Sequence, residues 1–317
     1  MTSIVFMGTP AFAANILQGI FDSNKYDVQA VVTQPDRKVG RKHKLTPTPV
    51  KEVALAHNVQ VLQPEKISKS DEADKIIELN PDIIITAAFG QFLPMSVINA
   101  AKIGTINVHG SLLPKYRGGA PIQRAIMNGD SETGVSIMYM EKKMDAGDVL
   151  VQATMPINDN DDSGTIFEKM SDLGRDTLLK MLPDFIDNKI KAVPQNEAEV
   201  VFAPNIKPEE EELHLSQNAK QLDWKIRALR PYVGAYFNDF KGKRVKLWDI
   251  TVLDEKTNES AGTVVGVGKH NLKIAAAEGT VYQINKLQVA GKPQMDITAY
   301  LNGLGQGIKV GQKLINE

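Results

Sequence analysis

The chain of 317 residues contains no cysteine. This absence excludes disulfide bonds, thiolate nucleophiles and metal sites built from cysteine ligands. Histidine is scarce as well, and the five that are present lie scattered along the chain without the spacing of a ligand set: His43, His57, His109, His214 and His270. We therefore expect no bound metal, and any chemistry has to come from other side chains.

Long hydrophobic runs are also missing. No apolar stretch approaches the roughly 20 residues that a membrane span needs. The first eight residues read as an apolar strand that runs into a turn, without the basic start and long apolar centre of a secretory signal. We therefore expect a soluble cytoplasmic protein that makes no contact with membranes.

The formal net charge is only -1, which by itself argues against a nucleic-acid partner. The charges are unevenly distributed, however, because residues 220–317 hold 15 Lys and Arg against 9 Asp and Glu, whereas residues 1–219 hold 22 against 29. A basic C-terminal part is a hint of a polyanionic partner, and a solvated lysine-rich surface is the alternative.

Strand and helix patterns alternate through the first half of the chain. Short apolar, β-branched runs occur at residues 3–7, 28–33, 59–62, 82–86 and 104–108, and segments with helical spacing occur at residues 11–21, 50–57, 69–79 and 95–100. A further helix at residues 120–128, strands at 135–140 and 149–155, and a long helix at 165–187 follow. This alternation predicts a doubly wound, mostly parallel α/β sheet.

The remainder of the chain has a different pattern. A helix at residues 219–229 precedes strand-like runs at residues 244–253, 262–267, 271–276, 280–287 and 309–315, several of them separated by glycine. Such spacing predicts a small β-barrel of the oligonucleotide-binding type. With 317 residues the chain is long enough for two cores. We expect a first domain at residues 1–189, a linker rich in Pro, Lys and Glu at 190–208, and the barrel at 209–317.

The segment GTINVHGSLLP at residues 104–114 is the most informative for chemistry. Asn107 and His109 lie two positions apart, so they point to the same face at the carboxyl end of a strand, where open α/β sheets bind ligands. A carbonyl between them would be polarised. Downstream, Asp145 lies in a small-residue turn from which a carboxylate can reach back to a histidine. A capping asparagine, a structural histidine and plain turn residues are the alternatives.

Six sequence blocks occur in an order typical of one family. They are FMGTPAFA at 6–13, TQPDR at 33–37, AFGQFLP at 88–94, INVHGSLLP at 106–114, RGGAPIQ at 117–123 and MDAGD at 144–148. On these blocks the chain resembles the methionyl-tRNA formyltransferases from end to end. The resemblance implies a Rossmann-like formyltransferase fold with a C-terminal barrel, 10-formyltetrahydrofolate as the formyl donor, and initiator methionyl-tRNA as the acceptor.

The resemblance also implies roles for individual residues. Asn107, His109 and Asp145 take the catalytic positions of the family, with the Asn107 amide and a protonated His109 as an oxyanion hole and Asp145 orienting His109. The folate donor is expected at two short segments, formed by Phe89, Gly90, Gln91, Phe92 and Leu93 and by Ser111, Leu112, Leu113 and Pro114.

A long basic connection at residues 34–49 exceeds the usual 2 to 6 residues between strand and helix. The resemblance makes it the loop that recognises the acceptor end of tRNA, with Arg41 foremost, and phosphate contacts are also expected on the barrel. The expected tRNA-binding residues are Arg37, Lys38, Arg41, Lys42, Lys44, Lys243 and Arg244. A merely solvated basic loop is the alternative reading. We expect a monomer.

Three rival functions stay open at this point. A nicotinamide-dependent dehydrogenase needs a turn with three spaced glycines, and the first turn supplies only Gly8. A formyltransferase acting on a nucleotide or an amino sugar would share the same three catalytic residue types. A non-catalytic RNA-binding protein is the third rival.

Overall fold

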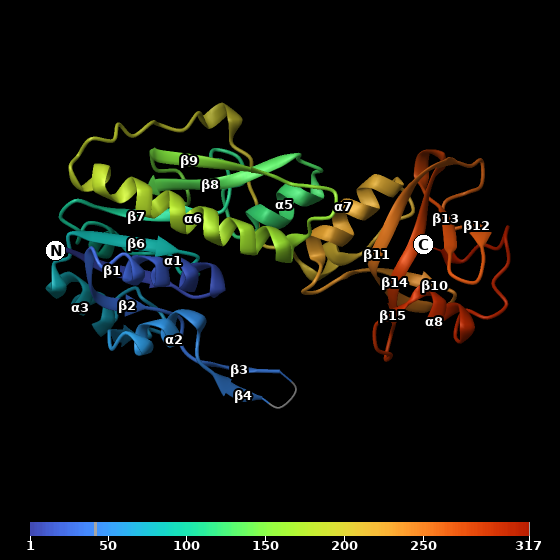
Figure 1. Cartoon of the computed structure of the whole chain (residues 1–317), viewed down its shortest axis with the longest axis horizontal. Helices are drawn as coiled ribbons and strands as arrows, with labels where there is room; N and C mark the ends of the chain where they lie inside the picture. Colours follow the sequence, from blue (N-terminus) through green and yellow to red (C-terminus); the bar gives the residue numbers. More distant parts are fainter. Residues whose placement is uncertain (41–42, 317) are drawn as a thin grey trace. The chain divides into compact units, whose positions relative to one another are not determined.

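The computed structural model describes residues 1–40 and 43–316 (Figure 1). It divides into two compact units. Unit 1 comprises Met1–Pro121, Glu132–Pro156 and Phe167–Pro204, and unit 2 comprises Ile122–Ser131, Ile157–Ile166 and Asn205–Glu317. Two short segments from the middle of the chain thus group with the C-terminal part. Across the described ranges, no helix combines the length and the apolar character that crossing a membrane requires.

Unit 1 is built on a seven-stranded sheet with the strand order β5-β2-β1-β6-β7-β8-β9. Its strands are β1 Thr2–Gly8, β2 Tyr26–Val32, β5 Gln60–Leu62, β6 Ile83–Ala87, β7 Gly104–His109, β8 Glu132–Tyr139 and β9 Val149–Pro156. The pairs from β5 to β7 are parallel, and β8 and β9 are antiparallel. The predicted mostly parallel α/β sheet is confirmed.

Helices connect these strands. They are α1 Ala11–Asp22, α2 Pro49–Ala56, α3 Asp71–Leu79, α4 Met95–Ile98 and α6 Ser163–Ile186. The start of α2 is set locally, because Pro49 occupies its first turn and the Thr48 hydroxyl accepts from the Lys51 N–H. Thr48 also shares a 2.7 Å hydrogen bond with Thr33 at the end of β2, so it anchors the base of the long connection to the sheet.

The long connection at residues 34–49 contains a hairpin that sequence reasoning treated as a loop. Strands β3 Arg37–Val39 and β4 Lys44–Thr46 pair with each other in an antiparallel ladder, and Figure 1 shows them extending away from the main sheet. All six of these strand residues are exposed. The hairpin was not predicted because neither strand has a buried face, so apolar and polar residues do not alternate along it.

Unit 2 carries a second sheet with the strand order β12-β13-β14-β11-β10-β16, and β15 pairs with β14. Its strands are β10 Ala235–Phe240, β11 Lys243–Lys256, β12 Val264–Val267, β13 Leu272–Ala275, β14 Thr280–Val289, β15 Met295–Asp296 and β16 Ile315–Asn316, with helices α5 Pro121–Met127, α7 Ala219–Leu229 and α8 Ile297–Asn302. All pairs in this sheet are antiparallel. The prediction that the C-terminal part forms a small β domain is confirmed.

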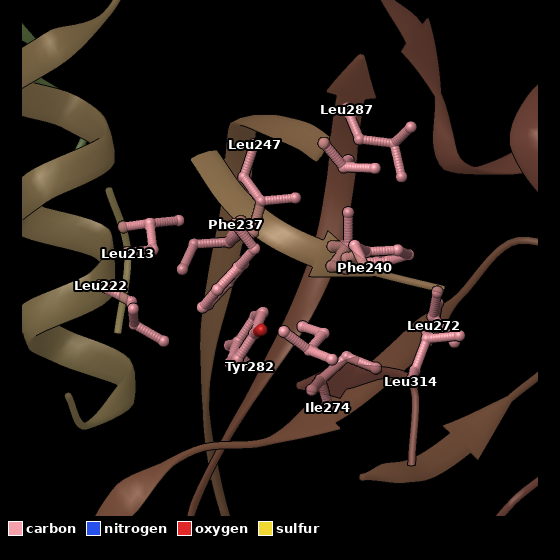
Figure 2. Packing of buried hydrophobic residues seen from close by; sticks show 14 of the residues in the cluster. Leu213, Leu222, Phe237, Phe240, Leu247, Leu272, Ile274, Tyr282, Leu287 and Leu314 are labelled. Atoms are coloured by element: carbon pink, nitrogen blue, oxygen red, sulfur yellow. The ribbon is translucent and has the colours of Figure 1, made fainter. Parts of the chain in front are cut away.

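One core fills unit 2. Figure 2 shows Leu222 of α7 and Phe237 and Tyr282 of the sheet pointing to the same interior. Every one of these three side chains is at most 2% exposed. The amphipathic helix and the alternating strands therefore close a single hydrophobic layer.

Some element predictions for this part were wrong. The strand predicted at residues 309–315 reduces to Ile315–Asn316, because glycines at 303, 305, 307 and 311 divert the chain into turns. Strand β10 and helix α8 were missed. In β10 the run AYFNDF mixes aromatic and polar residues without strict alternation, which hides it from a period-2 pattern.

Polar contacts hold the segment 157–166 in unit 2. The buried Arg227 donates to the Asp161 carbonyl oxygen at 2.8 Å, and Arg230 pairs with Asp162 at 3.0 Å. By contrast, residues 193–203, which fall in the predicted linker, return to unit 1: Val193 exchanges two backbone hydrogen bonds with Val149. The two units are therefore defined by packing and not by a single cut in the chain.

Candidate active site

Adjacent parallel strands β6 and β7 end at the same edge of the sheet. Thr86 of β6 lies opposite Asn107 of β7. Because the strands are parallel, the segments that follow them, residues 88–94 and 110–120, leave the sheet at one edge. The structure therefore brings the two predicted donor-binding segments and the Asn107–His109 pair together.

Asn107 is held through its side-chain oxygen. The Thr86 hydroxyl donates to Asn107 Oδ1 at 2.7 Å, and the Asn107 side chain is only partly buried. With Oδ1 engaged as an acceptor, the amide nitrogen Nδ2 keeps its two N–H groups for another partner. Sequence reasoning missed Thr86, which lies on a neighbouring strand 21 residues away.

His109 is buried, with 7% of its surface exposed. Its Nε2 lies 3.0 Å from the carbonyl oxygen of Tyr116. A carbonyl only accepts, so Nε2 carries the proton in this contact and the neutral ring has its lone pair on Nδ1. The tautomer is thus set by the Tyr116 carbonyl, a backbone group that no side-chain motif reveals.

Asp145 approaches the other ring nitrogen. Its Oδ2 lies 3.8 Å from His109 Nδ1, which is an ion-pair distance but too long for a direct hydrogen bond. The same oxygen accepts the backbone N–H of Gly118 at 2.9 Å. The side chain of Asp145 is 14% exposed. The carboxylate is therefore fixed by the loop after β7 and faces His109 across a short gap.

Three residues near these groups adopt left-handed backbone conformations that are uncommon outside glycine. They are Ala88, Tyr116 and Asp145, with φ values of 44°, 65° and 51°. Each follows a strand of the sheet, and each conformation costs about 1–3 kcal/mol, which the surrounding contacts must offset. Such residues concentrate at functional sites, and here they flank Asn107 and His109.

The first donor-binding segment, residues 89–93, has one buried end and one exposed end. Phe89 packs into the core of unit 1, and its carbonyl accepts from Thr9 and Gln34. The Gln91 side chain is bonded to residues 64–67, whereas Phe92 is 74% exposed. Gly90 has a φ of 86°, and Leu93 packs against the same core as Phe89. Phe92 is therefore the aromatic group of this segment that is open to a ligand.

The second segment, residues 111–114, is held by hydrogen bonds from strands β8 and β9. The Ser136 hydroxyl donates to the Ser111 carbonyl at 2.6 Å, and Gln152 donates to the Leu113 carbonyl at 2.8 Å. Leu112 and Pro114 are partly buried, and the Leu113–Pro114 peptide bond is cis. Backbone groups of this segment are thus held in fixed positions next to His109.

The predicted tRNA-binding residues lie in both units. In the hairpin, Arg37 pairs with Glu65 at 2.6 Å, and Lys38 and Lys44 are exposed. Arg41 and Lys42 lie outside the described residues. In unit 2, Lys243 is exposed at the start of β11, and the Arg244 guanidinium lies 3.4 Å from the centre of the Tyr236 ring. In the described part of the chain, no cluster of His, Asp or Glu fits a metal ion.

Comparison with known proteins adds family relationships to this geometry. The model of the formyl transferase family matches residues 1–182, and the model of the formyl transferase C-terminal domain matches residues 205–305. The chain is 64% identical over 317 residues to the methionyl-tRNA formyltransferase of Ligilactobacillus salivarius (strain UCC118), covering 100% of this chain and 99% of the relative. It is 58% identical over 314 residues to the methionyl-tRNA formyltransferase of Levilactobacillus brevis (strain ATCC 367), covering 99% of each.

Two solved structures share the fold at 19% identity. The sugar 3N-formyl transferase WlaRD, crystallised in the presence of dTDP and 5-N-formyl-THF, has a TM-score of 0.68 and covers 92% of this chain and 99% of its own. The N-formyltransferase from Helicobacter canadensis, in complex with folinic acid and dTDP-3-aminofucose, has a TM-score of 0.69 and covers 90% of this chain and 99% of its own.

Proposed function

This chain belongs to the methionyl-tRNA formyltransferase family, and we propose that it transfers the formyl group of 10-formyltetrahydrofolate to the α-amino group of methionine on the initiator tRNA. The formylated tRNA supports the initiation of translation. The match over the whole chain to methionyl-tRNA formyltransferases carries this proposal, because it includes both the part with Asn107 and His109 and the basic C-terminal part. An amino sugar or a nucleotide as acceptor is not favoured, since those relatives share only the fold.

Asn107 is proposed as the first oxyanion donor. When the neutral methionyl amine attacks the formyl carbon, negative charge develops on the former carbonyl oxygen. The Nδ2 group is free to donate because Thr86 occupies Oδ1. A preorganised donor of this kind contributes about 3–4 kcal/mol to the stabilisation of the transition state.

His109 is proposed as the second donor. Its Nε2–H is committed to the Tyr116 carbonyl, so a protonated ring has only Nδ1–H left for the oxyanion. Asp145 Oδ2 lies 3.8 Å from Nδ1, too far for a direct hydrogen bond, so the carboxylate leaves that N–H to the oxyanion. Asp145 then receives the proton that the amine loses, through water, while the bond between the formyl carbon and N10 of the donor breaks and N10 gains a proton.

The two segments at the edge of the sheet fit a folate donor. The backbone of residues 111–114 is held in a fixed position by Ser136 and Gln152, and Phe92 offers an exposed aromatic ring for the pterin. The site residues proposed for the donor are those predicted from the sequence, with Phe89 acting as a core support under the loop. The relatives WlaRD and the Helicobacter canadensis enzyme were solved with folate derivatives, which supports a folate donor.

The acceptor tRNA is proposed to contact the hairpin β3–β4 and the start of β11. Exposed Lys38 and Lys44 suit phosphate oxygens, and the Arg244–Tyr236 stack provides a cation beside an aromatic face. Arg41 is proposed as the main contact at the acceptor end on the sequence alone. We further propose a cytoplasmic monomer in which residues 1–189 carry out catalysis and residues 209–317 bind tRNA.

The test is transfer of labelled formyl from 10-formyltetrahydrofolate to three kinds of acceptor: methionyl-initiator tRNA, methionyl-elongator tRNA and small amines. Selective labelling of the initiator tRNA is the expected result. Labelling of small amines alone would support the chemistry at Asn107 and His109 but contradict tRNA as the acceptor. No labelling at all would contradict the proposed reaction.

A further inference from the structure

A buried arginine next to the site has no role in the mechanism above. Arg117 is 0% exposed, and its guanidinium donates to Gln195 Oε1 at 3.0 Å and to Glu197 Oε1 at 2.8 Å. Its Nη1 has no hydrogen-bond partner within the part of the chain that the structure describes. A buried and incompletely paired charge costs several kcal/mol. Stability alone is therefore a poor explanation for placing an arginine there.

Gln195 connects this arginine to the loop that carries Asp145. Its Nε2 donates to two backbone carbonyls of the loop, Asp145 O at 2.9 Å and Gly147 O at 2.8 Å. Its Oε1 is the acceptor for Arg117 Nε. Both N–H groups and the oxygen of this amide side chain are thus engaged between Arg117 and the loop.

The loop needs such a clamp, because its backbone is strained and tightly packed. Asp145 has a left-handed φ of 51°. A Cβ at Gly147 would lie 2.0 Å from the Tyr139 carbonyl oxygen, so the loop passes directly against the end of β8. The residue after Arg117, Gly118, donates its N–H to Asp145 Oδ2. Two contacts therefore hold the loop: Gln195, which is bonded to Arg117, holds its backbone, and the Gly118 N–H holds the Asp145 carboxylate.

We propose that Gln195 is a positioning residue for the transfer reaction, which fixes the Asp145 carboxylate opposite His109 by anchoring residues 145–147 to Arg117. Gln195 contacts neither the reacting atoms nor His109, and it acts only through the position of Asp145. The expected effect on kcat rests on the proposed function. The anchoring of residues 145–147 does not depend on that function.

The test variant is Gln195→Glu, which keeps the size of the side chain and the bond from Arg117 but replaces the two donated hydrogen bonds with repulsion between oxygens. Asn15→Asp is the matched control. The Asn15 amide also donates two hydrogen bonds, to Ser171 and Asp172, and its oxygen accepts from Arg175, but it joins α1 to α6 away from the loop. Both variants make the same chemical change in unit 1.

Steady-state kinetics provide the first readout. A displacement of Asp145 by about 1 Å is expected to lower kcat roughly 10- to 100-fold. KM for the folate and for the tRNA should stay within about twofold, because no substrate contact is lost. Asn15→Asp should keep the wild-type kcat. An equal loss of kcat in both variants, or a rise in KM at constant kcat, overturns the positioning role.

Amide hydrogen exchange provides a second readout that does not depend on catalysis. The Gly118 N–H is bonded to Asp145 Oδ2, so its exchange should accelerate at least tenfold in Gln195→Glu and stay unchanged in Asn15→Asp. Unchanged Gly118 exchange in Gln195→Glu overturns the anchoring. If wild-type protein transfers no formyl group while Gly118 exchange accelerates as expected, the proposed function fails and the anchoring stands.

Discussion

Substitution of Asn107 by aspartate isolates the proposed oxyanion donor. The Thr86 hydroxyl donates to Asn107 Oδ1 at 2.7 Å, and an aspartate oxygen accepts the same bond. The side chain should therefore keep its place while Nδ2 is exchanged for an oxygen that carries negative charge. Loss of one preorganised donor costs about 3–4 kcal/mol, which corresponds to roughly 10²- to 10³-fold in kcat, and repulsion of the oxyanion adds to this loss.

The assay is single-turnover transfer of labelled formyl to methionyl-initiator tRNA, with both substrates saturating, so that the chemical step is measured and not binding. Thr86→Val is a second variant for which we expect a smaller loss of kcat. This substitution removes the hydrogen bond to Asn107 Oδ1, so the amide can rotate. Loss of one net hydrogen bond of about 1 kcal/mol predicts that the transfer rate falls roughly fivefold to tenfold. Turnover of Asn107→Asp within about threefold of wild type would refute the oxyanion role.

Three further predictions concern the surroundings of the site. Gly147→Ala should lower kcat and the unfolding temperature together, because the added Cβ would lie 2.0 Å from the Tyr139 carbonyl oxygen; a fully active variant would show that the loop position is not needed. Arg41→Ala and Lys44→Ala should each raise the KM for tRNA severalfold without changing the KM for folate, whereas Lys102→Ala, at the amino end of β7, should change neither; equal tRNA kinetics in all three variants would contradict the hairpin assignment. Arg117 and then Lys143 hold the pKa of Glu197 at about 2, below its ordinary 4.5, so its ion pairs stabilise the fold above pH 4.5 and lose that contribution as the pH falls through 2. Urea unfolding should accordingly show the difference between wild type and Glu197→Gln shrinking between pH 4.5 and 2, and a difference that stays constant there would contradict this ion-pair account.

The sheet of unit 1 was predictable because its signals are local. The runs at residues 4–7 and 83–85 are continuously apolar, as expected for strands that are buried on both faces. The helices between the strands begin at proline or at capping residues. Helix α7 also begins and ends as predicted. Where the buried residues of an element follow its own periodicity, the sequence pattern is sufficient to predict that element.

The hairpin and strand β10 were not predictable by the same means. Strands β3 and β4 bury nothing, and β10 loses its alternation in the polar pair Asn238 and Asp239. The grouping of residues 122–131 and 157–166 with unit 2 depends on long-range contacts such as Arg227 with the Asp161 carbonyl. Pairings of this kind join residues 66 positions apart and leave no periodic trace.

The candidate site divides in the same way. Asn107, His109 and Asp145 were predicted from side-chain type, spacing and family resemblance, and in the structure His109 Nδ1 lies 3.8 Å from Asp145 Oδ2. Their supports were not identified, because Tyr116 acts through its carbonyl, Thr86 lies on a neighbouring strand, and Gln195 comes from a segment whose composition resembles a linker. Groups that act through the backbone or from a distant segment require the three-dimensional structure.

The most direct test of the proposed site is a crystal structure of this chain with a formyl-bearing tetrahydrofolate. The account predicts the formyl oxygen within about 2.7–3.1 Å of Asn107 Nδ2 and near His109 Nδ1, with the pterin between residues 89–93 and 111–114. A formyl group bound beyond hydrogen-bonding reach of both Asn107 and His109 would contradict the proposal that this edge of the sheet carries out the transfer.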